Sequence, residues 1–255
     1  MNNSHLENLI KRCLDDFWKR RIEALETLNL KNVLKHKNPY LFKACGIANA
    51  PEMVGQLLSA HVSSSDETIF GNVFFEPLCK AVTDSPIAAA AGADFAKERG
   101  DVYEVIALKS GPNIFNGSQM RKQGDEFNAI EASLRQTLRS MRKQFIPIMG
   151  CGYGSVYSEP TPKRRFFKLA GQAFWAHVTG DEDFYLKMVQ LMKNEPAKHR
   201  PAFKMEWDKA VNRFVRELTI DFCDPDGNIL WEKLTMFNSS YPKKLKRSET
   251  TKAQI

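Results

Sequence analysis

The feature that most constrains the fold is a strongly β-prone run in the middle of the chain. Residues 101–109 read Asp-Val-Tyr-Glu-Val-Ile-Ala-Leu-Lys and are nearly continuously apolar. A strand that is apolar on both faces is typical of the centre of a sheet that helices cover on both sides. Residues 92–99 have the pattern of a second strand, and Arg99-Gly100-Asp101 forms a tight turn between the two. The sequence therefore predicts an α/β fold built around this hairpin.

Helical periodicity flanks the hairpin on both sides. Leu6 to Leu28 carries apolar residues at three- and four-residue spacing, which predicts one long amphipathic helix. Two shorter apolar runs predict further strands at 145–151 and 164–169. The other expected helices, which have the same apolar spacing, are 50–60, 127–143, 174–178, 183–193 and 202–222.

Composition excludes several classes of protein. The 255 residues are 43% hydrophobic and 26% charged, which is typical of a soluble globular protein. There is no run of ~20 apolar residues that could cross a membrane, and the N-terminus lacks the pattern of a secretory signal. The five cysteines form no CxxC pair and indicate free thiols in a reducing compartment. HExxH, GxxxxGK[ST] and GxGxxG are also absent, which excludes the common zinc hydrolase, P-loop and Rossmann classes.

The charge of the chain favours a polyanionic partner. Lysine and arginine number 37 against 30 acidic residues, which gives a net charge of +7. The basic residues gather on the first predicted helix, on the 127–143 helix, at 163–165 and in the last residues. Each group is either a solvated face or a set of phosphate contacts.

A carboxylate and a lysine stand on the two strands of the hairpin. Asp94 ends or bends the first strand and Lys109 ends the second, so the hairpin brings both to one edge of the sheet. A carboxylate can hold Mg²⁺, which binds one or two carboxylates together with phosphate oxygens and water. A desolvated lysine near phosphate can position or activate water. The pair indicates metal-assisted phosphodiester hydrolysis, and the alternative is a salt bridge or a solvated strand end.

This arrangement resembles the PD-(D/E)xK nuclease core, in which an Asp on one strand is followed by (D/E)-x-Lys on the next. Here the second half reads Ala107-Leu108-Lys109, with alanine in place of the acid. A longer match resembles the PmeII family of type II restriction endonucleases, in which a small residue commonly stands at that position. Its most specific run is Leu-Lys-Ser-Gly-Pro-Asn. The matching stretches, in the family's order, are 38–41, 63–71, 105–113, 116–119, 152–154, 171–175 and 179–182.

The resemblance implies an α/β fold with a PD-(D/E)xK restriction-endonuclease-like core, in which helices flank a central mixed sheet, and with additional N- and C-terminal helices. No linker is rich enough to separate domains, so we expect residues 1–255 to form a single nuclease domain. Its expected regions are a helical N-terminal region at 1–60, the catalytic core at 61–170, a helical C-terminal region at 171–240 and a flexible tail at 243–255.

The implied activity is Mg²⁺-dependent hydrolysis of phosphodiester bonds in double-stranded DNA at a short palindrome, of the GGNCC kind in some relatives. A two-fold DNA site implies a homodimer, and the helices at 6–28 and 202–222 are the alternatives for its interface. A cognate DNA methyltransferase would be a functional partner in a restriction-modification system, without physical contact. The implied location is the prokaryotic cytoplasm, with no membrane association.

The resemblance also implies roles for individual residues. Asp94 would be the metal carboxylate, Lys109 the catalytic lysine and the backbone carbonyl of Leu108 a further metal ligand. Glu67 is the best candidate for a second carboxylate, acting directly or through water.

Two acidic residues have alternative interpretations. Ser64-x-x-Glu67 matches a capping box, so Glu67 could cap a helix, and the two roles can coexist. Glu104 is the other acid on the second strand. It lies five residues from Lys109, so regular alternation points it to the opposite face, and we rank it below Glu67.

A polar loop follows the lysine and offers donors for the scissile phosphate or a groove edge, unless it is an ordinary solvated loop. The arginines of the 127–143 helix and the basic residues near 163 have the same two interpretations. The expected DNA-binding residues are Ser110, Asn113, Asn116, Ser118, Gln119, Arg135, Arg139, Lys163 and Arg164.

Two other functions compete with the endonuclease. Ala107 favours a non-catalytic DNA-binding relative of such nucleases. The basic charge alone is also compatible with a structural or assembly protein that has no nucleic-acid role.

Overall fold

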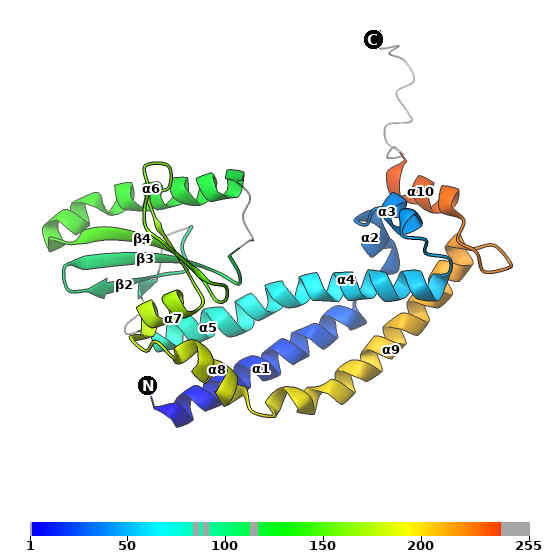
Figure 1. Cartoon of the computed structure of the whole chain (residues 1–255), viewed down its shortest axis with the longest axis horizontal. Coiled ribbons are helices and arrows are strands. Elements are labelled where there is room, and N and C mark those ends of the chain that lie inside the picture. Colours follow the sequence, from blue (N-terminus) through cyan, green and yellow to red (C-terminus); the bar gives the residue numbers. More distant parts are fainter. Residues whose placement is uncertain (1, 84–86, 89–91, 113–116, 241–255) are drawn as a thin grey trace, which may run out of the picture. The chain divides into compact units, whose positions relative to one another are not determined.

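The computed structural model describes residues 2–83, 87–88, 92–112 and 117–240 (Figure 1). The chain divides into two compact units. The first comprises Met1–Arg20 and Asp66–Arg200, and the second comprises Arg21–Ser65 and Pro201–Ile255. The boundaries of the two units differ from those of the four regions expected from the sequence, and the single nuclease domain stays a prediction.

The first unit contains a mixed sheet, which has six strands within the described residues, in the order β1-β2-β3-β4-β6-β5. β3 pairs antiparallel with β2 and parallel with β4, and β4 pairs parallel with β6. The central position predicted for the strand at 101–109 is therefore confirmed, and the strand itself begins one residue later, at Val102. The strands are β1 (Ile87–Ala88), β2 (Phe95–Arg99), β3 (Val102–Lys109), β4 (Gln144–Cys151), β5 (Val156–Ser158) and β6 (Phe167–Ala170).

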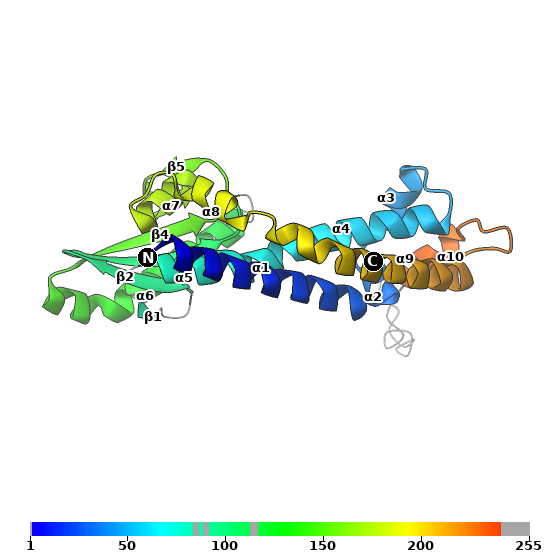
Figure 2. The same cartoon turned by 90° about the horizontal axis from the view of Figure 1, so that it is seen from below.

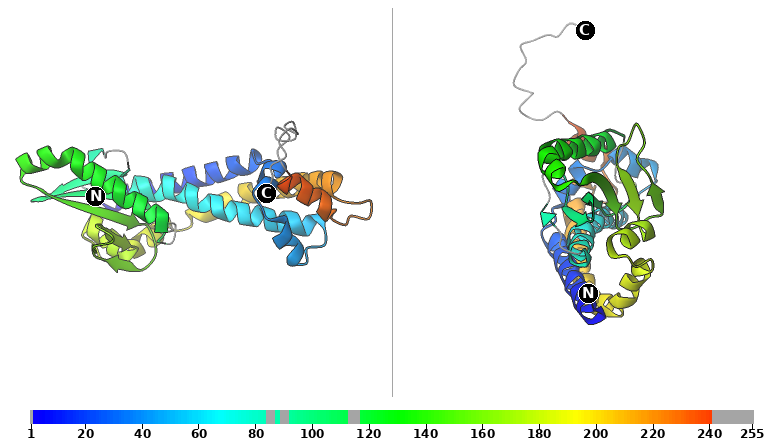
Figure 3. Two further views of the ribbon diagram at one scale, coloured as in Figure 1. Left: turned by 90° about the horizontal axis from the view of Figure 1, so that it is seen from above. Right: turned by 90° about the vertical axis from the view of Figure 1, so that its left-hand side faces the viewer.

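Helices cover both faces of this sheet, as the apolar character of β3 requires (Figures 1 and 3). Ile106 and Leu108 pack in a cluster with residues of α1, α5, α7 and α8. Val105 and Ala107, which point the other way, pack in a second cluster with Phe127 of α6. The helices are α1 (Asn3–Glu26), α5 (Glu76–Val82), α6 (Gly117–Met141), α7 (Gln172–Thr179) and α8 (Phe184–Met192).

The second unit is helical in the part that the structure describes (Figure 2). Its core includes Leu25, Leu57, Phe214 and Leu218. The side-chain amide of Asn238 ties α10 to the chain after α2 by donating to the carbonyl oxygens of residues 34 and 37. The remaining helices are α2 (Leu30–Lys35), α3 (Pro39–Ala44), α4 (Ala50–Phe70), α9 (Glu195–Phe222) and α10 (Trp231–Ser239).

The apolar stripes of the two helices considered for a dimer interface are buried inside the chain itself. Leu6, Ile10 and Leu14 of α1 belong to the cluster beneath the sheet. Phe214 and Leu218 of α9 belong to the core of the second unit. These stripes are therefore not available to a second copy.

The segment before the hairpin is more continuously helical than the sequence indicated. The predicted 50–60 helix runs on to Phe70, and a π-helical stretch, Gly71–Phe75, joins it to α5. The capping box at Ser64-x-x-Glu67 is wrong, because both residues lie inside α4 rather than at its start. Burial of Phe74 and Phe75 beneath the sheet outweighs the local capping signal.

Other differences concern element boundaries. The predicted 127–143 helix begins ten residues earlier, at Gly117, so Ser118 and Gln119 lie in a helix rather than a loop. The strand predicted at 164–169 is β6, at Phe167–Ala170. β5, α2, α3 and α10 were not predicted, because each is too short to show a clear period. All five cysteines are free thiols, as expected, and no helix among the described residues has both the length and the apolar character needed to cross a membrane.

Packing of α7 against β4 predicts a strong effect of one glycine substitution. A Cβ atom at Gly150 would lie 2.1 Å from the Phe174 ring. Gly150→Ala should lower the free energy of unfolding by about 1–3 kcal/mol through overpacking, measured by urea denaturation. Gly124→Ala is the matched control. Gly124 lies within α6, and its added Cβ would lie an ordinary 3.7 Å from the Phe166 ring. It should raise stability by about 0.5–1 kcal/mol, and equal effects of the two substitutions would contradict the packing described.

Candidate active site

Asp94 is fixed to β3 by its own side chain. It lies in the bend that leads into β2, and its backbone N–H donates to the Ile106 carbonyl oxygen at 2.9 Å. Its carboxylate Oδ2 accepts a hydrogen bond from the backbone N–H of Leu108 at 2.6 Å. The carboxylate therefore lies beside the residue that precedes Lys109, at the C-terminal end of the central strand, as the hairpin predicted.

The backbone of β3 turns the Leu108 carbonyl toward the same edge. The Lys109 carbonyl oxygen accepts from the Gly152 N–H at 2.9 Å and so faces β4. Backbone groups of successive strand residues point to alternate neighbours. The Leu108 carbonyl consequently faces away from β4, toward the side on which its own N–H meets Asp94.

The Asp94 carboxylate and the Leu108 carbonyl oxygen are suitable ligands for a hard divalent cation. The described residues contain no group of three or more His, Cys, Asp or Glu side chains arranged to hold a metal. Mg²⁺ does not need such a group, because it binds through one or two carboxylates and completes its shell with water and phosphate oxygens. An ionised Asp94 and the Leu108 carbonyl are oxygen donors of the required kind.

Lys109 lies where the buried part of β3 ends. Its side chain shares the α6 face of the strand with Ala107, and it pairs in register with Cys151 of β4. Burial raises the pKa of the Cys151 thiol to about 11, and the charges of Lys168 and Lys109 act in the opposite direction. Cys151 therefore stays a neutral thiol next to the lysine.

Glu67 reaches the same edge from the last turn of α4. Its carbonyl oxygen accepts from Ser110 Oγ at 3.0 Å, and its Oε2 accepts from the Tyr153 hydroxyl at 3.3 Å. The Tyr153 N–H in turn donates to the Ser110 carbonyl oxygen at 3.1 Å. These three bonds join α4 to the residues that follow β3 and β4. Burial, together with the charge and the hydrogen bond of Glu67, raises the pKa of Tyr153. The phenol therefore stays protonated and donates a hydrogen bond to the Glu67 carboxylate.

Two glycines allow this close approach. A Cβ at Gly71 would lie 2.3 Å from Ser110 Oγ, and a Cβ at Gly111 would lie 2.4 Å from the Tyr153 ring. Neither Tyr153 nor these glycines has a role predicted from the sequence, although all three lie in the stretches that carry the resemblance. Their contacts link residues far apart in sequence, which no local pattern reveals.

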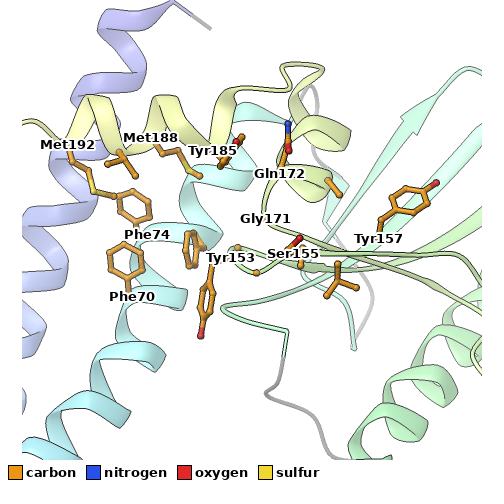
Figure 4. Close-up of a pocket in the computed structure, with 17 residues that line it drawn as sticks. Phe70, Phe74, Tyr153, Ser155, Tyr157, Gly171, Gln172, Tyr185, Met188 and Met192 are labelled. Carbon is orange, nitrogen blue, oxygen red and sulfur yellow. The ribbon is translucent and has the colours of Figure 1, made fainter.

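Two hollows adjoin Tyr153. The smaller, of about 270 Å³, is lined by Phe17, Asp66, Glu67, Phe70, Phe75 and Tyr153. The larger, of about 640 Å³, has aromatic and methionine walls that include Phe74, Tyr185, Met188 and Met192 (Figure 4). Tyr153, Phe70 and Phe75 line both hollows, so the two lie next to each other.

Glu104 lies on the other face, as alternation predicted, and has a structural environment. It is buried and its Oε2 lies 3.2 Å from His177 Nε2 of α7. Burial acts to raise the pKa of Glu104, but the hydrogen bond and charge of His177, with Arg99 and Lys97, outweigh it and lower that pKa. Lys97 and Arg99 also donate to carbonyl oxygens at the end of α7. The cluster fastens α7 to the hairpin.

The expected DNA-binding residues do not form one group. Ser110 is buried at the C-terminal end of β3, which we call the candidate catalytic edge, and Ser118 and Gln119 are exposed in the first turn of α6. Asn113 and Asn116 lie outside the described residues. The Arg164 guanidinium donates to Ser158 Oγ and to the Glu159 and Phe166 carbonyl oxygens, so it holds the β5–β6 connection together, and Lys163 is exposed in that connection.

Arg135 and Arg139 lie near the opposite end of α6. At a rise of ~1.5 Å per residue, Arg135 is about 27 Å along the helix from Gly117. α6 begins soon after β3 ends, and it finishes where β4 begins. The two arginines are therefore remote from the candidate catalytic edge.

A mixed sheet flanked by helices, with an acid and a lysine on adjacent strands, is the architecture of a restriction-endonuclease-like fold. The model of the family described as "Type II restriction endonuclease EcoO109I" matches residues 4–200. The chain belongs to this family, which is one of DNA-cleaving hydrolases. No curated protein matches the chain. The predicted class, type II restriction endonuclease, is confirmed, whereas the narrower PmeII family is not the one that matches.

The Glu104 environment predicts a pH-dependent stability. Because its folded-state pKa is lowered, its contribution is present above about pH 4.5 and is lost as the pH falls through the folded pKa. Glu104→Gln should lower the free energy of unfolding at pH 7 by about 1–3 kcal/mol, and the difference from wild type should shrink at acidic pH. Urea denaturation across pH checks this. DNA cleavage should persist in the variant, and loss of cleavage at unchanged stability would contradict the structural role.

Proposed function

We propose that the protein is an Mg²⁺-dependent endonuclease that hydrolyses phosphodiester bonds of double-stranded DNA at a short palindromic site. The observation that carries the proposal is the hydrogen bond from the Leu108 N–H to the Asp94 carboxylate, immediately before Lys109. It gathers a carboxylate, a backbone carbonyl and an ammonium group at one strand end. The family match supports the same reaction class.

In this mechanism each group has a separate task. Asp94 and the Leu108 carbonyl would hold the cation, and Glu67 would act on it directly or through a water molecule. When bound there, Mg²⁺ supplies charge stabilisation at the phosphate and a more acidic water. Lys109 places a positive charge beside the scissile phosphate and orients the attacking water. Tyr153 holds the Glu67 carboxylate toward the edge.

The finer features of the proposal rest on the sequence resemblance. They are membership of the PmeII group, a recognition site of the GGNCC kind, a homodimer that matches a palindrome, a methyltransferase that protects the same sequence, and a prokaryotic cytoplasmic location. The buried stripes of α1 and α9 direct the search for a dimer interface to other surfaces.

A second candidate function, a DNA-binding relative without activity, is favoured by Ala107. This residue is 1% exposed and packs with Val105, Met149 and Phe127. An acid at this position would have to enter an apolar cluster, so the site is built without one.

The decisive test uses plasmid DNA, Mg²⁺ and two substitutions that preserve shape. Asp94→Asn retains an oxygen for the Leu108 N–H but removes the charge, and Lys109→Met keeps the apolar stem. Each should reduce cleavage by about 10²–10⁴-fold while binding of the mapped site persists. Asp101→Asn, an exposed acid at the other end of the hairpin, is the matched control. Discrete fragments from wild type exclude the inactive relative, and undiminished cutting by either site variant would refute the assigned roles.

A separate test concerns Glu67. Glu67→Gln should reduce cleavage and raise the Mg²⁺ concentration needed for half-maximal rate, because a neutral amide holds a cation less well. Tyr153→Phe removes only the hydroxyl that contacts Glu67 and should give a smaller effect of the same kind. Metal titration of initial cleavage rates measures both. If Glu67→Gln left the Mg²⁺ dependence unchanged, Glu67 would be restricted to its contacts with Ser110 and Tyr153.

A further inference from the structure

A third hollow, lined mostly by charged and polar side chains, lies where α6 ends. It has a volume of about 500 Å³, and three arginines from the last turns of α6 and the residue after it line its wall. We call Arg135, Arg139 and Arg142 the arginine pocket. The other lining residues are Glu131, Leu138, Lys143, Gln144 and Phe145.

The register of the sheet places this pocket at the opposite end from the candidate catalytic edge. Gln144, which lines the pocket, pairs with Val102 at the start of β3, whereas Cys151 pairs with Lys109. Seven residues of extended strand separate the two ends, which is about 23 Å. Both ends belong to the same compact unit.

The charge of the pocket is largely uncompensated. All three arginines are exposed, and no hydrogen bond or ion pair joins their side chains to any residue that the structure describes. Lys143 differs, because its Nζ lies 2.5 Å from Glu98 and is neutralised there. Glu131 is the acid among the lining residues. Three guanidinium charges thus face one carboxylate.

Arg142 stands at a backbone position that usually holds glycine. The Arg142 N–H donates to the Arg139 carbonyl oxygen and the Lys143 N–H to that of Leu138, which is the pattern of a Schellman motif. Arg142 occupies its left-handed position with φ 54°, where glycine is the usual residue. A helix terminus carries only about half a unit of negative charge, which does not require three arginines and a strained backbone.

We infer that the arginine pocket binds backbone phosphates of the DNA duplex beyond the cleavage site, about six or seven base pairs from the scissile bond. Guanidinium groups match phosphate oxygens in geometry and charge. The inference includes a duplex whose axis runs alongside β3, so that the ~23 Å between the two ends of the sheet corresponds to six or seven base pairs at a rise of ~3.4 Å. The inference rests on the proposed function, because it takes DNA as the substrate held at the candidate catalytic edge.

The first test compares two duplexes centred on the mapped cleavage site. One ends about four base pairs beyond the cut on each side and the other continues for about fourteen, so only the longer one reaches the pocket. In the triple variant Arg135→Gln/Arg139→Gln/Arg142→Gln, affinity for the long duplex should fall roughly tenfold. The slope of log affinity against log salt concentration should become shallower by about one unit for each phosphate contact that is lost. Affinity for the short duplex should be unchanged.

The matched control removes the same charge elsewhere. Lys187, Lys193 and Lys198 are paired with acids on the surface of the same unit, and their replacement by glutamine should leave the length dependence of binding intact. Equal loss on both duplexes, loss on neither, or the same effect from the control variant would each overturn the inference.

A single substitution separates binding from a structural role. Arg142→Gly removes one guanidinium and relieves the left-handed strain, so it should raise the melting temperature by about 2 °C while weakening binding of the long duplex. Lower stability with unchanged binding would show that Arg142 serves only the helix end. Cleavage by the wild-type protein tests the proposed function separately. If the protein cuts DNA but its binding does not depend on duplex length, the proposed function stands and the inference about the arginine pocket is refuted.

Discussion

The hydrogen bond between the Leu108 N–H and the Asp94 carboxylate is the contact on which the rest of the site depends. β3 continues past the point where β2 can supply a backbone partner, and a buried N–H without an acceptor is costly. The Asp94 side chain takes the place of that missing strand, so its position is set by the sheet itself. Because a carboxylate has two oxygens, it can hold the backbone and still face a cation. Structure and proposed chemistry therefore rely on the same group.

Sequence reasoning succeeded where one segment carried the information by itself. The apolar run of β3 predicted a central strand, and the position of Lys109 at its end followed directly. The capping box at Ser64-x-x-Glu67 was wrong, because the capping signal is local, whereas burial of Phe74 and Phe75 beneath the sheet extends the helix, and the carboxylate role of Glu67 stays a prediction. The contact between Tyr153 and Glu67 spans 86 residues and had no signature in the chain. The arginines of α6 were identified as basic, but their distance from the site depends on where α6 ends.

Ala107 shows how the core and the site constrain each other. β3 is buried on both faces, so the side chain at position 107 points into the apolar cluster that also contains Phe127 of α6. The chain keeps the layer closed and leaves a small residue there. A cation bound at this edge would then depend more on water and on the phosphate of the substrate. On the proposed mechanism, such an arrangement would make metal binding depend on bound DNA.

The contacts of Tyr153 also bear on biosynthesis. Glu67, Asp94 and Lys109 all leave the ribosome before the strand β4 and the tyrosine that follows it. Asp94 can already accept from the Leu108 N–H and Ser110 can already donate to Glu67, but the pairing of Lys109 with β4 and the bond from Tyr153 to Glu67 need those later residues. A nascent chain therefore carries its acids and its lysine without an assembled edge. This order of synthesis leaves the proposed site incomplete until β4 and Tyr153 have been added.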